Sequence, residues 1–428
     1  MMKERRRIDL RPRKERVILL GLITPGEAYD LDHPLSELEQ LARTAGGEIV
    51  DKVTQRAPHF NASTYIGSGK AEEVRALVAR TDADTVICDH DLSPAQVRNL
   101  EQLLDVKVVD RSELILDIFA IHARTRQAKL QVELAQLEYM MPRLVGMWTH
   151  FERPEGAIGT RGPGEQQLET DRRLVRRRRD KLKHQLETIQ ERKERQVASR
   201  RSYTLSLIGY TNAGKSTLLN ALTGAGVLVE DQLFATLDTK SVRWEVKKNQ
   251  YAVLSDTVGF IRRLPHHLVA SFHATLEEAT QADLLLHVAD ASHPRVEEQM
   301  ESVHDVLEEL ECADRPCLTL LNKADAVRDP ARLTLLQDGH PDRIVVSAVT
   351  GDGLGELREQ VAERMSSRYT EVRVSAAVGQ GKLIAFLRGN ASVIDETVRD
   401  GKVEIAATID RRLVGPLKRL AGSADVHA

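Results

Sequence analysis

The sequence has few of the features that mark secreted, disulfide-bonded or membrane proteins. It contains three cysteines in 428 residues, Cys88, Cys312 and Cys317, and their spacing fits neither a disulfide framework nor a zinc site. No apolar run approaches the roughly 20 residues that a membrane-spanning helix needs. The basic segment 1–16 lacks the apolar core of a secretory signal. We therefore expect a chain without a transmembrane segment and a cytoplasmic location, with attachment at the membrane surface left open.

Aromatic side chains are also scarce, at 4% of residues, and the net charge is only −3. Scarce aromatics argue against base stacking on single-stranded nucleic acid as the main mode of binding. The small net charge conceals a dense basic stretch at 172–183, which includes four consecutive arginines at 176–179. This stretch is either a solvated helix face or a surface for ribosomal RNA phosphates. We favour RNA because four consecutive side chains point around most of a helical turn and cannot all pair with one partner helix.

The chain is too long for one hydrophobic core, and its patterns predict four segments. Strands alternating with helices over 1–110 predict an N-terminal α/β domain with a largely parallel sheet. Residues 111–201 are predicted to form a long antiparallel helical hairpin, with one helix from 111 to about 140 that Pro142 ends. A Gly-rich loop, either a hinge or an RNA contact, leads into its second helix. Residues 202–366 are predicted to be a nucleotide-binding α/β domain, and residues 367–428 a small C-terminal α/β domain.

The pattern G-x-x-x-x-G-K-[ST] occurs at 209–217, between an apolar strand and a helix. In that context the loop backbone directs its N–H groups at phosphate oxygens, and the helix N-terminus adds a positive dipole end. Lys215 is predicted to reach the β- and γ-phosphates and to be catalytic, and the Ser216 hydroxyl is predicted to bind Mg²⁺. The predicted phosphate-binding residues are Gly209, Tyr210, Thr211, Asn212, Ala213, Gly214, Lys215, Ser216 and Thr217.

Two further segments are predicted to face the γ-phosphate. The loop at 234–238 follows the first helix, and Thr236 is our candidate for a Mg²⁺ ligand and catalytic residue, with Thr239 as the alternative. A strand ends in D-x-x-G at 256–259, where Asp256 is expected to hold Mg²⁺ through water and the Gly259 N–H is expected to sense the γ-phosphate. The candidate residues are Phe234, Ala235, Thr236, Leu237, Asp238, Asp256, Thr257, Val258 and Gly259.

The string N-K-x-D at 322–325 follows another strand and predicts selection of guanine. The Asp325 carboxylate can accept hydrogen bonds from N1–H and the exocyclic amine of guanine, whereas adenine offers neither donor. Lys323 can cover the base plane, and the Ala348 N–H can reach the guanine O6. The candidate base-binding residues are Asn322, Lys323, Ala324, Asp325, Ser347, Ala348 and Val349. The motifs follow one another in this order, and each lies at the carboxyl end of a predicted strand. Together they predict a Mg²⁺-dependent enzyme that hydrolyses GTP to GDP and phosphate.

Two residues bear on the mechanism. Phe260 follows Gly259 at the place where Ras-like enzymes carry a glutamine that orients water. Because phenylalanine cannot orient water, we predict slow hydrolysis by the protein alone and acceleration by a partner. Asn212 is a candidate for holding a monovalent cation such as K⁺ near the β/γ bridge, although an asparagine in a turn is also ordinary.

Several stretches carry a family resemblance: AKLQVELA at 128–135, RGPGE at 161–165, DTVGFIR at 256–262 and the segment 264–278. On these residues the chain resembles the HflX family of translational GTPases along nearly its whole length. The resemblance implies that the protein binds the 50S ribosomal subunit, contacts 23S rRNA through its hairpin and splits stalled or idle 70S ribosomes. It also implies ATP binding by the N-terminal domain. One departure is Thr239, where the family usually has proline.

The sequence leaves two other functions open. Gly67-Ser68-Gly69-Lys70 is either a tight turn or a second phosphate loop. In the second case the chain would be an rRNA-remodelling, helicase-like ATPase driven by its N-terminal domain. A role in tRNA modification ranks last, because no flavin or cysteine chemistry supports it. We expect the protein to be a monomer.

Overall fold

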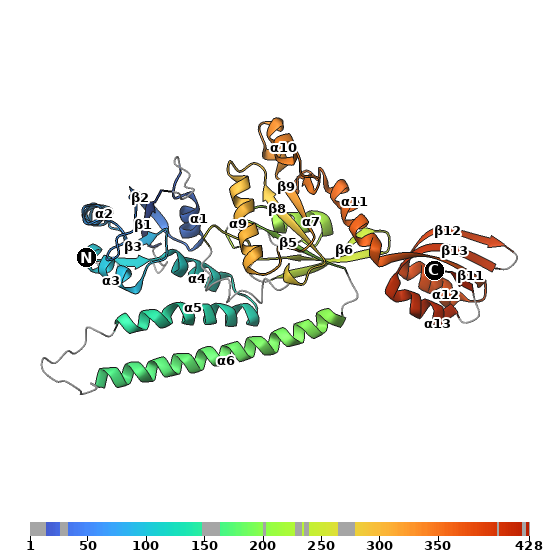
Figure 1. Cartoon of the computed structure of the whole chain (residues 1–428), viewed down its shortest axis with the longest axis horizontal. Coiled ribbons are helices and arrows are strands. Elements are labelled where there is room, and N and C mark those ends of the chain that lie inside the picture. The colour runs from blue at the N-terminus through green and yellow to red at the C-terminus, as the bar shows by residue number, and fades with distance from the viewer. Residues whose placement is uncertain are drawn as a thin grey trace, which may run out of the picture. The chain divides into compact units, whose positions relative to one another are not determined.

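The computed structural model describes residues 14–25, 33–147, 163–199, 203–226, 233–234, 239–263, 279–399, 402–421 and 425–427. They fall into two compact units (Figure 1). The first unit runs to Thr188 and includes Phe234, and the second contains most of the remaining residues. Within the described part of the chain, no helix combines the length and apolar character that crossing a membrane requires.

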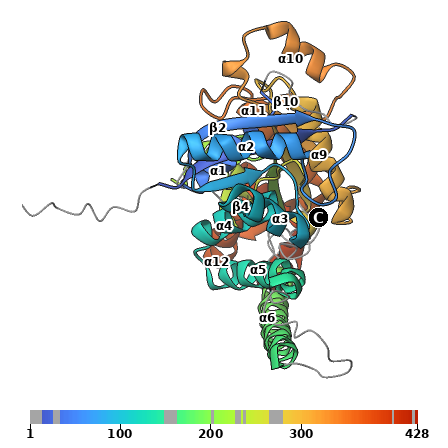
Figure 2. The same ribbon diagram turned by 90° about the vertical axis from the view of Figure 1, so that its left-hand side faces the viewer.

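The N-terminal unit is built on a four-stranded parallel sheet, as the alternation of strands and helices predicts. The strand order is β2-β1-β3-β4. The helices α2 and α3 pack on the face of the sheet that carries Ile18, Leu20 and Leu22 (Figure 2). The bounds are β1 (Arg16–Ile23), α1 (Ser36–Thr44), β2 (Glu48–Arg56), α2 (Ser68–Thr81), β3 (Thr85–Cys88), α3 (Pro94–Leu104), β4 (Lys107–Val109) and α4 (Arg111–His122).

The single helix expected over 111–140 is instead two helices, α4 and α5 (Arg126–Met147). The chain becomes extended at Ala123, with φ −66° and ψ 106°. The Thr125 hydroxyl then accepts a hydrogen bond from the Ala128 N–H at 3.1 Å and so starts the next helix. The expectation that Pro142 ends the helix was also wrong, since it lies inside α5.

Helix α5 lies beside the long helix α6 (Pro163–Ser199), and the two run in opposite directions in Figure 1. The Arg178 guanidinium donates to both carboxylate oxygens of Glu133, at 2.7 and 2.9 Å. Lys183 forms an ion pair with Glu138 at 2.9 Å, and Leu182 between these two basic residues is fully buried. These contacts join the two helices into the hairpin that the helical spacing predicts.

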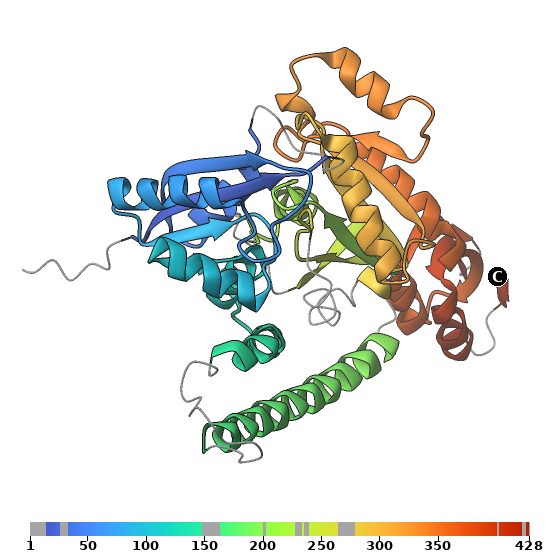
Figure 3. The ribbon, with the colours of Figure 1, turned by 60° about the vertical axis from the view of Figure 1, so that its left-hand side comes forward.

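The second unit contains a six-stranded sheet of order β10-β9-β8-β5-β7-β6, in which only β6 is antiparallel to its neighbour. Helices α7 and α11 pack on one face of its core. In Figure 3 the gold helix α9 and the orange helix α11 flank the strands. The bounds are β5 (Tyr203–Gly209), α7 (Lys215–Thr223), β6 (Lys240–Lys247), β7 (Gln250–Asp256), β8 (Leu284–Asp290), α9 (Val296–Glu309), β9 (Cys317–Asn322), η1 (Ala324–Ala326), α10 (Pro330–Gln337), β10 (Arg343–Val345) and α11 (Leu354–Met365).

The C-terminal segment forms an antiparallel sheet of order β12-β13-β11-β14 with its own apolar core. The strands predicted at 370–374 and 402–408 are present as parts of β11 and β13. The bounds are η2 (Ser366–Arg368), β11 (Tyr369–Ala377), α12 (Gly381–Asn390), β12 (Ala391–Arg399), β13 (Lys402–Asp410), η3 (Arg411–Leu413), α13 (Val414–Ala421) and β14 (Asp425–His427). The predicted fold class, an α/β nucleotide-binding domain flanked by two smaller α/β parts and a helical hairpin, is confirmed.

Candidate nucleotide-binding site

The loop between β5 and α7 has the shape of a phosphate cradle. Gly214 precedes α7 with φ +92°, a backbone conformation that other residues rarely adopt. A Cβ atom at this position would lie 2.4 Å from Asn322 Nδ2, so only glycine fits. Asn212 in the same loop also has a positive φ, of 59°, and its side chain is exposed. The loop therefore opens into the N-terminus of α7, where backbone N–H groups are available to an anion.

Lys215 starts α7 with a buried side chain, 7% exposed. Its Nζ donates to the carbonyl oxygens of Gly209 at 3.0 Å and Tyr210 at 2.8 Å. Burial lowers the pKa of the Lys215 ammonium to about 8, and the nearby Asp256 carboxylate offsets this only in part. A phosphate group placed here would favour the charged form of Lys215, because its negative charge would stabilise the buried ammonium.

Ser216 and Asp256 meet at the edge of the sheet where β5 and β7 end. The Ser216 hydroxyl donates to Asp256 Oδ2 at 2.6 Å, and Asp256 is fully buried. A hydroxyl and a carboxylate beside a phosphate cradle form an all-oxygen donor set of the kind that Mg²⁺ prefers. These two residues therefore fit the magnesium role that the motifs predict, and would bind it together with phosphate oxygens and water.

The D-x-x-G segment lies directly against the phosphate loop. The Phe260 N–H donates to the Gly209 carbonyl at 3.1 Å, and the Thr211 N–H donates to the Phe260 carbonyl at 2.7 Å. A Cβ atom on Gly259 would lie 2.8 Å from Thr211 Cα and 3.0 Å from Lys215 Nζ, so this close approach requires glycine. The Phe260 side chain is 2% exposed. It is thus a packing group and holds no polar atom that could orient water.

Tyr210 adds a contact that the motif pattern did not reveal. Its hydroxyl accepts a hydrogen bond from the Arg262 N–H at 2.8 Å, and its side chain is 8% exposed. The second residue of the phosphate loop therefore fixes the chain beyond the D-x-x-G segment. The only sign of this contact in the sequence is a tyrosine at a position where the motif permits any residue.

The predicted base-binding strings converge at the ends of β9 and β10. Asn322 donates from Nδ2 to the Ala213 carbonyl at 2.8 Å, and its Oδ1 accepts from the Ala348 N–H at 3.1 Å. The Ser347 hydroxyl donates to Asp325 Oδ1 at 2.5 Å. Through these bonds, Asn322 ties the base-binding strings to the phosphate loop, and Ser347 fixes the carboxylate expected to read guanine.

The remaining candidates differ in their surroundings. Ala324 begins the short helix η1, and Val349 is 77% exposed. Thr257 donates from its hydroxyl to the Leu207 carbonyl at 2.6 Å and so braces the sheet. Phe234 is buried against Phe119 of α4, with ring centroids 4.7 Å apart. Four candidates, Ala235, Thr236, Leu237 and Asp238, lie outside the described residues.

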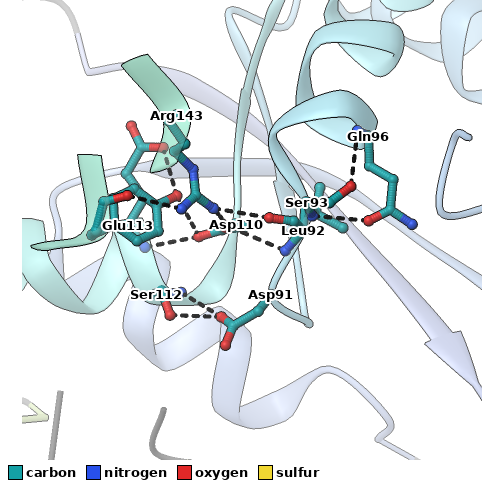
Figure 4. A network of polar contacts seen from close by, with 9 residues as sticks. Asp91, Leu92, Ser93, Gln96, Asp110, Ser112, Glu113 and Arg143 are labelled. Carbon is teal, nitrogen blue, oxygen red and sulfur yellow. Dashed lines mark hydrogen bonds and ion pairs between the residues drawn. The ribbon is translucent and has the colours of Figure 1, made fainter. Parts of the chain in front are cut away.

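A second polar cluster lies at the carboxyl ends of β3 and β4 (Figure 4). Arg143 of α5 pairs with Asp110 at 2.6 Å and donates to the Leu92 carbonyl at 2.9 Å. The Tyr139 hydroxyl donates to the same carboxylate at 2.8 Å. Burial raises the pKa of Asp110, although these partners counteract it. Because Arg143 and Tyr139 both belong to α5 and both bind Asp110 at the end of β4, these contacts fix the base of the hairpin.

At the second possible phosphate loop, Gly67 precedes α2 and its N–H donates to Gln55 Oε1 at 3.1 Å. Lys70 pairs with Glu73 at 2.7 Å along the helix surface. The segment thus forms the start of a helix, and its lysine is directed to a neighbouring carboxylate.

One mostly parallel sheet thus carries a phosphate cradle, a hydroxyl–carboxylate pair and a guanine-selective string. This combination is typical of the P-loop GTPases, which hydrolyse GTP. Comparison with known proteins narrows this class. Four family models match consecutive parts of the chain: "GTP-binding GTPase N-terminal" at 32–120, "GTP-binding GTPase Middle Region" at 122–200, "50S ribosome-binding GTPase" at 204–323 and "HflX C-terminal domain" at 334–427. The chain belongs to the HflX family of GTPases.

Two relatives named GTPase HflX agree with this assignment. GTPase HflX of Lacrimispora saccharolytica is 44% identical over 415 residues, covering 96% of this chain and 97% of the relative. GTPase HflX of Escherichia coli is 48% identical over 355 residues, covering 82% of this chain and 83% of the relative. A crystal structure of a GTP-binding protein from Sulfolobus solfataricus with GDP is 25% identical, has a TM-score of 0.44, and covers 82% of this chain and 99% of that chain.

Proposed function

We propose that this GTPase binds the 50S ribosomal subunit in its GTP state, splits stalled or idle 70S ribosomes, and is stimulated in hydrolysis by the large subunit. The observation that carries the proposal is the exposed arginine surface of α6 on a chain with a "50S ribosome-binding GTPase" domain. It acts, in this proposal, as a cytoplasmic monomer, and a membrane-surface association is not needed.

The five arginines at 173–179 of α6 divide into two groups. Arg178 is bound to Glu133 of α5, and Arg179 donates to the adjacent Asp180 at 2.6 Å. The side chains of Arg173, Arg176 and Arg177 are exposed. We name these three the arm arginines. Exposed guanidinium groups on a helix longer than 30 residues suit the phosphates of folded RNA, and 23S rRNA is the proposed partner.

The proposed roles at the nucleotide follow the motifs. Ser216, Thr236 and, through water, Asp256 would hold Mg²⁺, while the Gly259 N–H would report the γ-phosphate. Asn322, Lys323, Asp325 and Ala348 would bind guanine. The burial of Phe260 supports slow hydrolysis without a partner, because no side chain at that position can orient water. Asn212, exposed in the phosphate loop, is the proposed K⁺ ligand.

The alternative, an ATPase in the N-terminal domain that remodels rRNA, has weaker support. Its loop begins α2 with one N–H already bound to Gln55, and Lys70 pairs with Glu73. An ATP site there would have to displace the Lys70 pair. Lys215→Ala separates the two functions, since it should abolish GTP-dependent ribosome binding and leave an N-terminal ATPase intact.

The test of the RNA surface replaces all three arm arginines with glutamine. We expect weaker 50S binding, and a salt slope reduced by about 0.7–0.9 for each lost phosphate contact. The matched control replaces Arg75, Arg80 and Arg358, which are also exposed, and so removes the same charge elsewhere. Equal losses in both triple variants would mean that only net charge matters, and would refute the assignment of the arm.

Nucleotide dependence is tested by sucrose-gradient sedimentation with 50S subunits. Co-migration with a non-hydrolysable GTP analogue, and not with GDP, supports the proposal. Equal co-migration with both nucleotides would remove the γ-phosphate from control of ribosome binding.

A further inference from the structure

Asp290 lies at the carboxyl end of β8, directly beside the strand that carries the N-K-x-D string. In the register of β8 and β9, Asp290 is the partner of Asn322. The Ala291 N–H donates to the Asn322 carbonyl at 2.9 Å, so the sheet pairing continues one residue past the strand. The backbone therefore brings the Asp290 side chain to the edge where the base-binding string begins.

The Asp290 carboxylate is held on one side and engages Lys323 on the other. Its Oδ1 accepts from the Ser292 N–H at 3.0 Å and from the Ser292 hydroxyl at 2.5 Å. Its Oδ2 forms an ion pair with Lys323 Nζ at 2.8 Å. The Asp290 side chain is 16% exposed and that of Lys323 30%. A carboxylate fixed by a turn and mostly shielded from water is a firm support for a flexible lysine.

Lys323 itself has an unusual backbone. Its φ is +61°, in the left-handed region that non-glycine residues rarely occupy. Such strain is retained where the surroundings determine the conformation, and it concentrates at functional sites. Backbone and side chain of Lys323 are thus both fixed, the former by its place between β9 and η1 and the latter by Asp290.

We infer that Asp290 is a positioning residue that holds the Lys323 side chain ready to cover the guanine base. The inference rests on the proposed role of the string at 322–325 in binding guanine. A lysine has four rotatable bonds, and binding a nucleotide would otherwise have to immobilise them. Asp290 immobilises the Lys323 side chain before the nucleotide binds, and it acts on the base only through that lysine.

The experiment is a double-mutant cycle on GDP affinity with the full chain. Asp290→Asn keeps an acceptor for Ser292 and removes the charge that holds Lys323. We expect GDP binding to weaken about two- to tenfold, the range that corresponds to releasing one long side chain. In the Lys323→Ala background the same substitution should change affinity by less than about 1.5-fold, because its effect passes through the lysine. Additive losses, or no loss in Asp290→Asn alone, would overturn the inference.

Two controls separate this inference from its foundation. Asp342 lies just before β10 and forms an ion pair with Arg364 in the same domain. Asp342→Asn removes that ion pair and should leave GDP affinity unchanged. Ser292→Ala loosens the Asp290 carboxylate without changing its charge and should weaken binding in the same direction by a smaller factor. If Lys323→Ala and Asp325→Ala both left GDP affinity intact, the proposed base site itself would be wrong. If Lys323→Ala and Asp325→Ala weaken GDP binding but Asp290→Asn does not, only the positioning role of Asp290 is refuted.

Discussion

Asn322 offers the sharpest test of how the site is held together. Its amide is 1% exposed and spans from the Ala213 carbonyl to the Ala348 N–H. Asn322→Ala leaves the carbonyl of Ala213, itself a buried residue, without its side-chain donor, which costs about 1–3 kcal/mol, while water can reach the half-buried Ala348 more easily. If about 2 kcal/mol of this cost reduces the stability of the GDP-bound state, GDP affinity should fall roughly tenfold to thirtyfold.

The comparison of Asn322→Ala with Asn322→Asp makes this test specific. Aspartate still offers an oxygen to the Ala348 N–H, but it places a carboxylate oxygen where a donor now lies 2.8 Å from the Ala213 carbonyl. Because two oxygens repel there, Asn322→Asp should bind GDP more weakly than Asn322→Ala, although it is closer in shape. Affinity is measured by titration of a fluorescent GDP analogue. The control is Asn390→Ala, an exposed asparagine that donates to the Phe386 carbonyl within α12 at 2.9 Å, and it should leave GDP affinity unchanged. Equal affinity of Asn322→Asp and the wild type would refute the bridging role.

Three further predictions concern single contacts. The pKa of Lys215 is lowered to about 8 by burial, and an anionic phosphate must raise it, so GDP binding should take up protons above about pH 8 and weaken as the pH rises further. Calorimetry in two buffers of different ionisation enthalpy measures this uptake, and its absence would contradict the burial argument. Tyr210→Phe removes the hydrogen bond from the Arg262 N–H, worth about 1 kcal/mol, and should speed hydrogen exchange of that amide about fivefold. Arg143→Met leaves the buried Asp110 carboxylate without its cationic partner and should cost about 3–5 kcal/mol of N-terminal unit stability in denaturant unfolding, with Asp110→Asn in the same background recovering much of it.

The parts of the site that could be read from the sequence are those in which local backbone shape determines the residues. Gly214 and Lys215 belong to a strand–loop–helix unit whose chemistry is contained in one short stretch, and the structure places them as that unit requires. The N-terminal strands were found because β1 and β3 are short buried runs between clear turns. In each case neighbours in the sequence supply the signal.

The parts that were missed depend on contacts between distant residues. Asp290 reaches Lys323 only because β8 pairs with β9, and no local pattern marks it. The break between α4 and α5 depends on the Thr125 hydroxyl competing as a helix cap, against apolar spacing that continues through it. The burial of Phe234 against Phe119 likewise follows from tertiary packing, which the loop sequence does not specify.

We propose that GTP hydrolysis by this protein is coupled to the large ribosomal subunit. It is tested most directly by measuring GTP turnover of the purified chain with and without 50S subunits, at matched salt and Mg²⁺. The account predicts slow turnover alone and a marked acceleration on adding 50S subunits, which the arm-arginine triple variant should reduce. A turnover rate that 50S subunits leave unchanged would contradict it.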